Sequence, residues 1–325
     1  MKRVAFVLVA LVAMSAAAEA VILLQVHPDP RRLGAFLLSL SFTLCAFVGL
    51  SQPSLVRSLR QWAVESVWAA SALPLLLLLP YLVYALGTGS FSWLGAAKLL
   101  AYIFVPTLLL LPDRRHRPAH LGWRDVVAML ALALPVAADW LEGIWTWPFD
   151  LYIFRPLFCV CVGMYAFAVV RNLEGIGYRL LWRRQDALDG SANFLAFTVF
   201  GIPLGMAMSF IHPHFSSASF EQFPLQFFAI YLTIAIPEEL LFRGILQNLL
   251  CRSIRRGPTG LYGLLMASVI FGASHLHHAP VPNWRYGILA TLAGVFYGYT
   301  YRNRQRISAS ALTHALVDTA WHFWF

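Results

Sequence analysis

Long apolar runs follow one another through most of this chain, and they restrict its fold more than any other feature. A helix needs about 20 mostly apolar residues to cross the hydrocarbon core of a bilayer. An open sheet cannot satisfy its backbone in lipid, and a β-barrel would alternate polar and apolar residues. We therefore predict an all-α transmembrane helical bundle with about 11 spans. The runs cover residues 4–26, 33–50, 66–86, 93–111, 125–138, 151–170, 192–210, 224–250, 261–278, 285–301 and 307–325.

The composition favours a membrane protein over a soluble one. Hydrophobic residues make up 59% of the chain and charged residues 12%, whereas soluble domains carry about 25% charged residues. The formal net charge of +9 would raise nucleic acid as a partner of a soluble protein. Here the Lys and Arg residues lie in short loops between apolar runs, so they indicate orientation in the bilayer, and we expect no nucleic-acid partner.

Loops with and without basic residues alternate along the chain. Because basic loops stay on the cytoplasmic side, 11 spans place the N-terminus in the cytoplasm and the C-terminus outside. Only Arg31 and Arg32 depart from this pattern. Short loops and an Arg-rich inner face fit a bacterial inner membrane. The basic loops lie near residues 57–60, 114–124, 171–184, 252–256 and 302–306, and the others at 87–92, 139–150, 211–223 and 279–284.

The N-terminus allows two interpretations. Lys2 and Arg3, an apolar stretch and the small residues 15–18 resemble a cleavable signal peptide. The apolar character resumes at once after residue 20, so we favour an uncleaved first span; cleavage would leave 10 spans. The four cysteines show neither metal-binding nor disulfide spacing, and we interpret them as buried apolar residues.

The longest polar connection, residues 171–191, is the expected boundary between two parts of the chain. We predict an N-terminal helical region of unknown role over residues 1–190 and a catalytic transmembrane core over residues 191–325. Tyr178 to Trp182 is an amphipathic stretch beside Arg183 and Arg184, and we expect it to lie on the membrane surface.

Ionisable residues inside the apolar runs gather in the C-terminal third. Each costs about 2.5–3.5 kcal/mol at membrane depth on insertion scales, so it persists where it is paired or useful. These residues are Glu238, Glu239, Arg243, His275, His314, Asp318 and His322.

Two adjacent glutamates form the first cluster of these residues. Glu239 and Arg243 are four apart, so they share a helix face and can pair. Glu238 points about 100° away from Glu239, and no cation of its own helix can pair with it. Pro237 removes a backbone hydrogen bond and can kink the helix just before the acids. An ion pair for helix packing explains Glu239 and Arg243 but leaves Glu238 unexplained.

The other two clusters are centred on histidines. His275 shares a helix face with Phe271, and taken alone such a histidine is more often a packing residue than a catalytic one. His314 and Asp318 are four apart, so the carboxylate can orient the imidazole. His322 lies one turn further along and can also reach Asp318. A purely structural His–Asp pair is the alternative.

Taken together, the three clusters indicate hydrolysis. A carboxylate in an apolar site can act as a base near neutral pH, and histidines can hydrogen-bond a water or an oxyanion. Three helices of a bundle can bring these groups together, and the set suits hydrolysis of an amide bond by water. Other protease signatures are absent from the sequence: it has no HExxH, no GxSxG and no GxGD.

The three motifs, in the order EExxxR, FxxxH and HxxxD/N, resemble a known family. They read here as Glu238 to Arg243, Phe271 to His275 and His314 to Asp318. This order is similar to the CPBP family of intramembrane glutamic endopeptidases, which includes the type II CAAX prenyl endopeptidases and the Abi-type membrane proteases. The resemblance covers about residues 190–325.

The resemblance implies a role for each motif residue. Glu238 would activate water with the help of His275. Glu239 and Arg243 would hold the site in shape. His314 and the residue at position 318 would help to stabilise the oxyanion.

Asp318 departs from the form that many relatives carry, which is Asn. An ionised Asp cannot donate a hydrogen bond to an oxyanion, so we expect Asp318 to orient His314 or to be protonated. We favour a mechanism without a metal or other cofactor. The alternative is zinc, which glutamate and histidine side chains can bind.

Three functions are compatible with these residues. The first is an endopeptidase that cuts peptide bonds within or near the membrane, the second a non-catalytic immunity or scaffold protein of the same fold, and the third a proton-coupled transporter. The complete polar set favours the enzyme, and a transporter would usually show repeated halves, which this sequence lacks. The expected partners are the lipid bilayer and a peptide or protein substrate, lipidated or not, which the sequence does not identify.

Overall fold

The computed structural model describes residues 29–116, 120–214, 218–254 and 260–325. Within these residues every regular element is an α-, 3-10 or π-helix, and no strand occurs. The all-α fold class predicted from the sequence is therefore confirmed. The predicted first span, residues 4–26, lies outside the described residues.

The chain divides into two compact units: Met1–Arg117 with Trp123–Asn172, and Pro118–Gly122 with Leu173–Phe325. The predicted functional division at residue 190 stays a prediction. The helices of the first unit are α2 (Pro30–Gly49), α3 (Pro53–Glu65), α4 (Val67–Ala72), η1 (Leu73–Leu78), α5 (Leu79–Thr88), α6 (Trp93–Leu110), η2 (Leu111–Arg114), α7 (Trp123–Ala137), α8 (Phe154–Gly163) and η3 (Met164–Val170).

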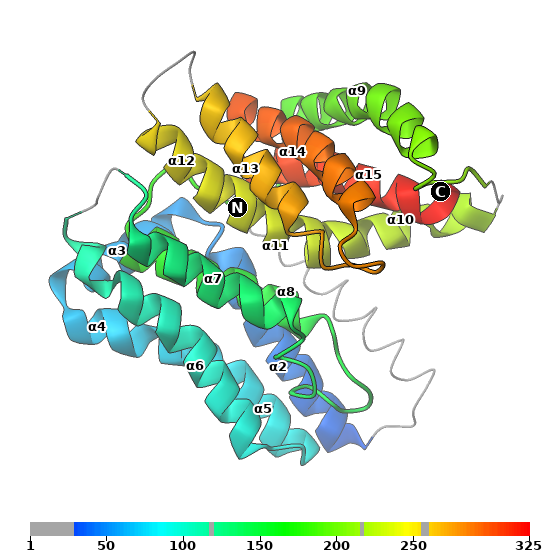
Figure 1. Cartoon of the computed structure of the whole chain (residues 1–325). Helices are drawn as coiled ribbons and strands as arrows, with labels where there is room; N and C mark the ends of the chain where they lie inside the picture. The colour runs from blue at the N-terminus through cyan, green and yellow to red at the C-terminus, as the bar shows by residue number, and fades with distance from the viewer. Residues whose placement is uncertain (1–28, 117–119, 215–217, 255–259) are drawn as a thin grey trace. The chain divides into compact units, whose positions relative to one another are not determined.

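The second unit contains every residue of the predicted site. In this unit α13 lies beside α14, and α9 lies along α14 and α15 (Figure 1). Its helices are α9 (Arg184–Ala207), α10 (Ala218–Ile230), η4 (Tyr231–Ala235), α11 (Ile236–Glu239), η5 (Leu240–Gln247), α12 (Asn248–Ser253), α13 (Leu261–Ala273), α14 (Trp284–Arg304) and α15 (Ile307–Trp324).

Five helical stretches in the described part of the chain are long and apolar enough to cross a membrane. The predicted number of 11 is not confirmed, because apolar runs and helices differ in length. The run 125–138 becomes the 15-residue α7 and the run 261–278 becomes the 13-residue α13, whereas a span needs about 20 residues. The predicted sides of the two termini depend on that number and stay predictions. The five stretches are Pro30–Gly49, Val67–Thr88, Trp93–Arg114, Arg184–Ala207 and Phe220–Ser253.

Hydroxyl groups inside these helices are satisfied without water. Thr43 donates to the carbonyl oxygen of Ser39 at 2.9 Å, and Thr107 donates to that of Ile103 at 2.7 Å. Such bonds to the preceding turn satisfy polar groups within one helix. Large apolar side chains such as Leu195 and Phe200 of α9 are exposed instead. Polar groups inside and apolar groups outside is the arrangement that a lipid environment favours.

Residues 173–183 run without a helix along the second unit. Their carbonyl groups accept hydrogen bonds from its helices: Tyr301 donates to Gly175 at 2.5 Å, and Arg306 donates to Leu181 at 2.5 Å. Tyr178 is buried and Trp182 is exposed, and the predicted position of this stretch on the membrane surface stays a prediction. Amphipathic character along the sequence did not reveal that this backbone is held inside by side chains from distant helices.

Glycines let α13 and α14 approach closely. A Cβ atom added at Gly272 would lie 2.4 Å from the carbonyl oxygen of Gly287 and 1.8 Å from Oγ1 of Thr291. Small residues at helix contacts are the usual means of close packing in membranes, where apolar burial alone gives little driving force. This contact holds α13, which ends two residues before His275, against α14.

We expect Gly272→Ala to destabilise the protein by about 1–3 kcal/mol, the usual cost of overpacking a tight contact. The new methyl group would meet a backbone carbonyl that cannot rotate away. Gly34→Ala is the matched control, since nothing lies within 4 Å of an added Cβ in α2, and it should be neutral or slightly stabilising. Thermal unfolding in detergent, followed by circular dichroism, measures both variants; equal melting temperatures would contradict the close contact.

Candidate active site

The two glutamates lie in the middle of a long continuous helix. Glu238 and Glu239 belong to the four-residue α11, between the π-helical segments η4 and η5. Pro237 lacks an N–H group and cannot take part in a regular ladder, and π-helical turns occur where such a ladder is interrupted, frequently at functional sites. The apolar stretch Phe220–Ser253 therefore carries its acidic pair at a backbone irregularity.

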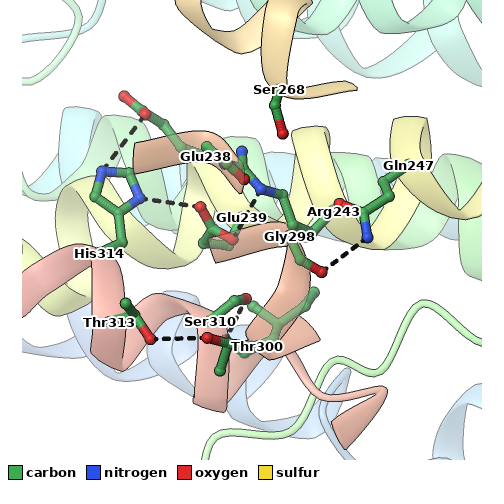
Figure 2. Close-up of polar contacts among 12 residues, drawn as sticks. Glu238, Glu239, Arg243, Gln247, Ser268, Gly298, Thr300, Ser310, Thr313 and His314 are labelled. Atoms are coloured by element: carbon green, nitrogen blue, oxygen red, sulfur yellow. Dashed lines mark hydrogen bonds and ion pairs between the residues drawn. The ribbon is translucent and has the colours of Figure 1, made fainter. Parts of the chain in front are cut away.

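Glu239 connects two helices through its buried carboxylate. Its side chain is 0% exposed, and Oε2 lies 3.3 Å from Nε of Arg243. Its other oxygen, Oε1, lies 3.1 Å from Nδ1 of His314 in α15 (Figure 2). The predicted pairing of Glu239 with Arg243 is confirmed. The contact with His314 was not predicted, because spacing along one helix carries no information about a residue on another.

Aromatic rings surround the guanidinium of Arg243, which is almost completely buried. Its centre lies 4.3 Å from the ring centroid of Phe271 and 5.4 Å from that of Tyr297. One terminal nitrogen donates to the carbonyl oxygen of Gly294 at 3.4 Å. Cation–π contacts are stronger where water is excluded, so these rings help Glu239 to offset the burial of the cation.

His314 faces carboxylates with both ring nitrogens. Nδ1 meets Glu239, and Nε2 lies 3.3 Å from Oδ2 of Asp318 and 3.8 Å from Oε2 of Glu238. The ring of Tyr297 stacks on the imidazole at 4.5 Å. The predicted pairing of Asp318 with His314 is confirmed. Only the imidazolium form can donate a hydrogen bond from both nitrogens, so this environment favours the protonated ring.

His275 lies just after the C-terminal end of α13. Its Nδ1 is 2.8 Å from the carbonyl oxygen of Phe271. A carbonyl oxygen only accepts hydrogen bonds, so Nδ1 carries the proton, and Nε2 of the neutral ring is left as an acceptor. The ring also packs against Phe271 and Tyr286, at centroid distances of 4.7 and 4.6 Å.

A cavity of about 90 Å³ lies between α9, α14 and α15, and it brings three predicted site residues together. His275, His314 and Asp318 line it, and aromatic and aliphatic side chains form most of the remaining wall. Glu238 is not one of the lining residues. Its carboxylate contacts one of the lining residues, His314, and about one-third of its side chain is exposed.

His322 is not part of this group. Its side chain is exposed, and its ring packs against Phe323 with a centroid distance of 4.9 Å. Asp318 contacts His314 instead. Asp318 and His322 are four residues apart, but the orientation of α15 turns His322 outward.

No three His, Cys, Asp or Glu side chains are grouped to hold a metal ion in the part of the chain that the structure describes. The best candidate ligand, His314, already has both nitrogens beside carboxylates. Whether the site works without zinc stays a prediction.

Residues 220–320 match the model of the family described as type II CAAX prenyl endopeptidase Rce1-like. The match confirms the resemblance of the three motifs to this family, and it contains all six predicted site residues from Glu238 to Asp318. Searches of curated proteins and of solved structures found no match. Together with the apolar helices, the family match supports an integral membrane protein with a peptidase role.

We expect Glu239→Gln to lower the stability of the protein by about 3–5 kcal/mol, the usual cost of breaking a buried ion pair. The change leaves Arg243 without its carboxylate. Glu238→Gln should melt like the wild type, because the buried oxygen Oε2 of Glu238 has no hydrogen-bond partner.

A double-mutant cycle tests the same pair. Glu239→Gln combined with Arg243→Met should regain part of the lost stability, because no unpaired charge remains, and the amide oxygen can still accept from His314. The interaction energy is read from melting in detergent. Equal losses in Glu238→Gln and Glu239→Gln would show that the pair with Arg243 is misassigned.

Proposed function

We propose that this chain is an intramembrane endopeptidase that hydrolyses peptide bonds with water activated by Glu238. The observation that supports the proposal best is the position of the Glu238 carboxylate. The side chain is partly exposed, and its buried oxygen Oε2 lacks a hydrogen bond and lies 3.8 Å from Nε2 of an otherwise fully engaged His314. A carboxylate without a donor is free to take a proton from water.

In the proposed reaction, the Glu238 carboxylate takes a proton from water while the water oxygen bonds to the peptide carbonyl carbon. The π electrons of the carbonyl move to its oxygen and give a tetrahedral oxyanion. When this intermediate collapses, the C–N bond breaks, and the proton held by Glu238 passes to the leaving nitrogen. His275 assists by accepting a hydrogen bond from the same water at Nε2.

Glu239 and Arg243 act in this proposal as positioning residues. Neither faces the cavity, and both are buried. Glu239 fixes Nδ1 of His314, and Asp318 accepts from Nε2. Residues that fix the orientation of a catalytic ring by hydrogen bonds in this way commonly have a large effect on activity.

The proposed substrate is a peptide or protein segment that reaches the site from the bilayer. The cavity wall is largely apolar, which suits an apolar group next to the scissile bond, whether or not the substrate carries a lipid. The family match is to an endopeptidase, and it favours neither the non-catalytic scaffold nor the proton-coupled transporter. We also propose the bacterial inner membrane as the location, with a cytoplasmic N-terminus and an external C-terminus.

We expect Glu238→Gln to lower the rate of cleavage by orders of magnitude. The amide keeps the size of the side chain but cannot take a proton from water. The measurement uses an internally quenched peptide with a prenylated cysteine and its unmodified counterpart, in detergent. The matched control is Glu221→Gln, an exposed glutamate of α10 outside the cavity, which should cleave like the wild type. Full activity in Glu238→Gln would remove the proposed base.

The same variant can identify the natural substrate. Because Glu238→Gln should bind substrate without cutting it, a protein co-purified with this variant and released intact is a substrate candidate. Cleavage of that protein by the wild type, at a peptide bond found by mass spectrometry, would define the substrate.

We expect cleavage to survive strong chelators, since both nitrogens of His314 are occupied by carboxylates. The purified protein should contain no stoichiometric zinc by elemental analysis. One zinc per chain, lost together with activity on chelation and restored with it, would establish the alternative mechanism.

A further inference from the structure

The proposed hydrolysis creates an oxyanion that needs a hydrogen-bond donor. Donors aimed at an oxyanion are often the largest single contribution to such catalysis. Asp318 stands where an amide could donate, but an ionised carboxylate only accepts. The inference below rests on the proposed function and concerns which group of the cavity replaces that donor.

Most polar groups that line the cavity already have partners. His314 directs both ring nitrogens to carboxylates. His275 uses Nδ1 on the Phe271 carbonyl, which leaves Nε2 as an acceptor. Thr198 donates its hydroxyl to the carbonyl oxygen of Leu195 at 2.7 Å. None of these groups has a free donor for an oxyanion.

Tyr286 lines the same cavity. It lies in the first turn of α14, where the side chain of Asn283 accepts a hydrogen bond from its N–H at 3.1 Å. Its ring is held between His275 and Trp321, at centroid distances of 4.6 and 5.1 Å. Among the described residues, none forms a hydrogen bond with its hydroxyl. Helix capping and ring packing therefore hold the phenol in place and leave its O–H group available.

We propose that Tyr286 is a catalytic residue whose hydroxyl donates a hydrogen bond to the oxyanion. The phenol donates without losing its proton, so the bond-breaking steps described above are unchanged. A neutral phenol carries a proton that it can donate in a hydrogen bond, whereas the ionised carboxylate of Asp318 carries none. Its contact with His275 places the donor next to the residue that assists the attacking water.

Two other side chains of the cavity wall carry donors that no described residue engages. Tyr297 is almost completely buried, and its ring lies flat on His314, so a substrate carbonyl has little access to it. Trp321 packs on Phe210 and Tyr286, and no ring contact joins it to either His275 or His314. Tyr286 is half-buried and contacts His275 directly.

We expect Tyr286→Phe to lower kcat by about 10²–10³-fold, the usual effect of removing one oxyanion donor. KM and the melting temperature should not change, because the ring and its packing remain. Tyr299→Phe is the matched control, because Tyr299 is exposed on the same helix. This variant should cleave the quenched peptides like the wild type. Tyr297→Phe keeps the ring that stacks on His314 and should cost much less than Tyr286→Phe.

Asp318→Asn supplies a second, independent measurement. The new amide can accept from His314 and also donate to an oxyanion, so it should reduce the need for Tyr286. The loss caused by Tyr286→Phe should therefore be clearly smaller in the Asp318→Asn background than in the wild type.

Each outcome separates the two proposals. If Glu238→Gln is inactive but Tyr286→Phe keeps its kcat, only the role of Tyr286 is overturned. A loss in Tyr297→Phe as large as that expected for Tyr286→Phe, with Tyr286→Phe unaffected, would assign the donor to Tyr297. If the wild type cuts neither peptide nor the captured substrate, or if Glu238→Gln cuts as well as the wild type, the proposed function fails and the role of Tyr286 fails with it.

Discussion

The carboxylate of Glu239 has no contact with water and lies between a guanidinium and an imidazole. A charge removed from water is stabilised only by well-placed partners, so the surrounding helices must hold Arg243 and His314 in register with it. The rings of Phe271 and Tyr297 complete this arrangement around Arg243. Because His314 belongs to α15 and Glu239 to α11, this interaction joins two helices at the central imidazole.

The same helix face continues the polar contacts toward the other end of α14. Arg243 donates to the carbonyl of Gly294, and Gln247, four residues further along, donates to that of Gly298 at 3.0 Å. A Cβ atom at position 298 would lie 2.7 Å from Oε1 of Gln247, so glycine leaves room for this approach without a shift of the amide. The long polar side chains of η5 thus reach the backbone of α14 where it carries glycines, and one row of residues joins the site to helix packing.

Contacts within one helix could be predicted from the sequence, and contacts between helices could not. The pairs Glu239–Arg243 and His314–Asp318 each have i,i+4 spacing, which helix geometry alone brings together. The contact of Glu239 with His314 and the packing of Tyr286 on His275 depend on how α13, α14 and α15 are arranged. Apolar runs predicted helices correctly, but the predicted number of spans is not confirmed, because hydropathy does not show where a helix ends. Residues 173–183 illustrate a further limit, since distant side chains decide their conformation.

The charges around His314 support different proposed roles for Glu238 and Asp318, although both are acidic and both lie beside the same ring. Three carboxylates, those of Glu238, Glu239 and Asp318, face two cationic groups, Arg243 and the protonated His314. One negative charge is left without a cation. Glu239 and Asp318 take the close contacts with the two ring nitrogens, so the remaining charge belongs to Glu238, at 3.8 Å and without a hydrogen bond. Of the three carboxylates, it is the one without a close ion-pair contact. In the proposed mechanism, Asp318 holds the imidazole in the form that engages both neighbours. Glu238 then takes the proton from water, and a group outside this charged cluster stabilises the oxyanion.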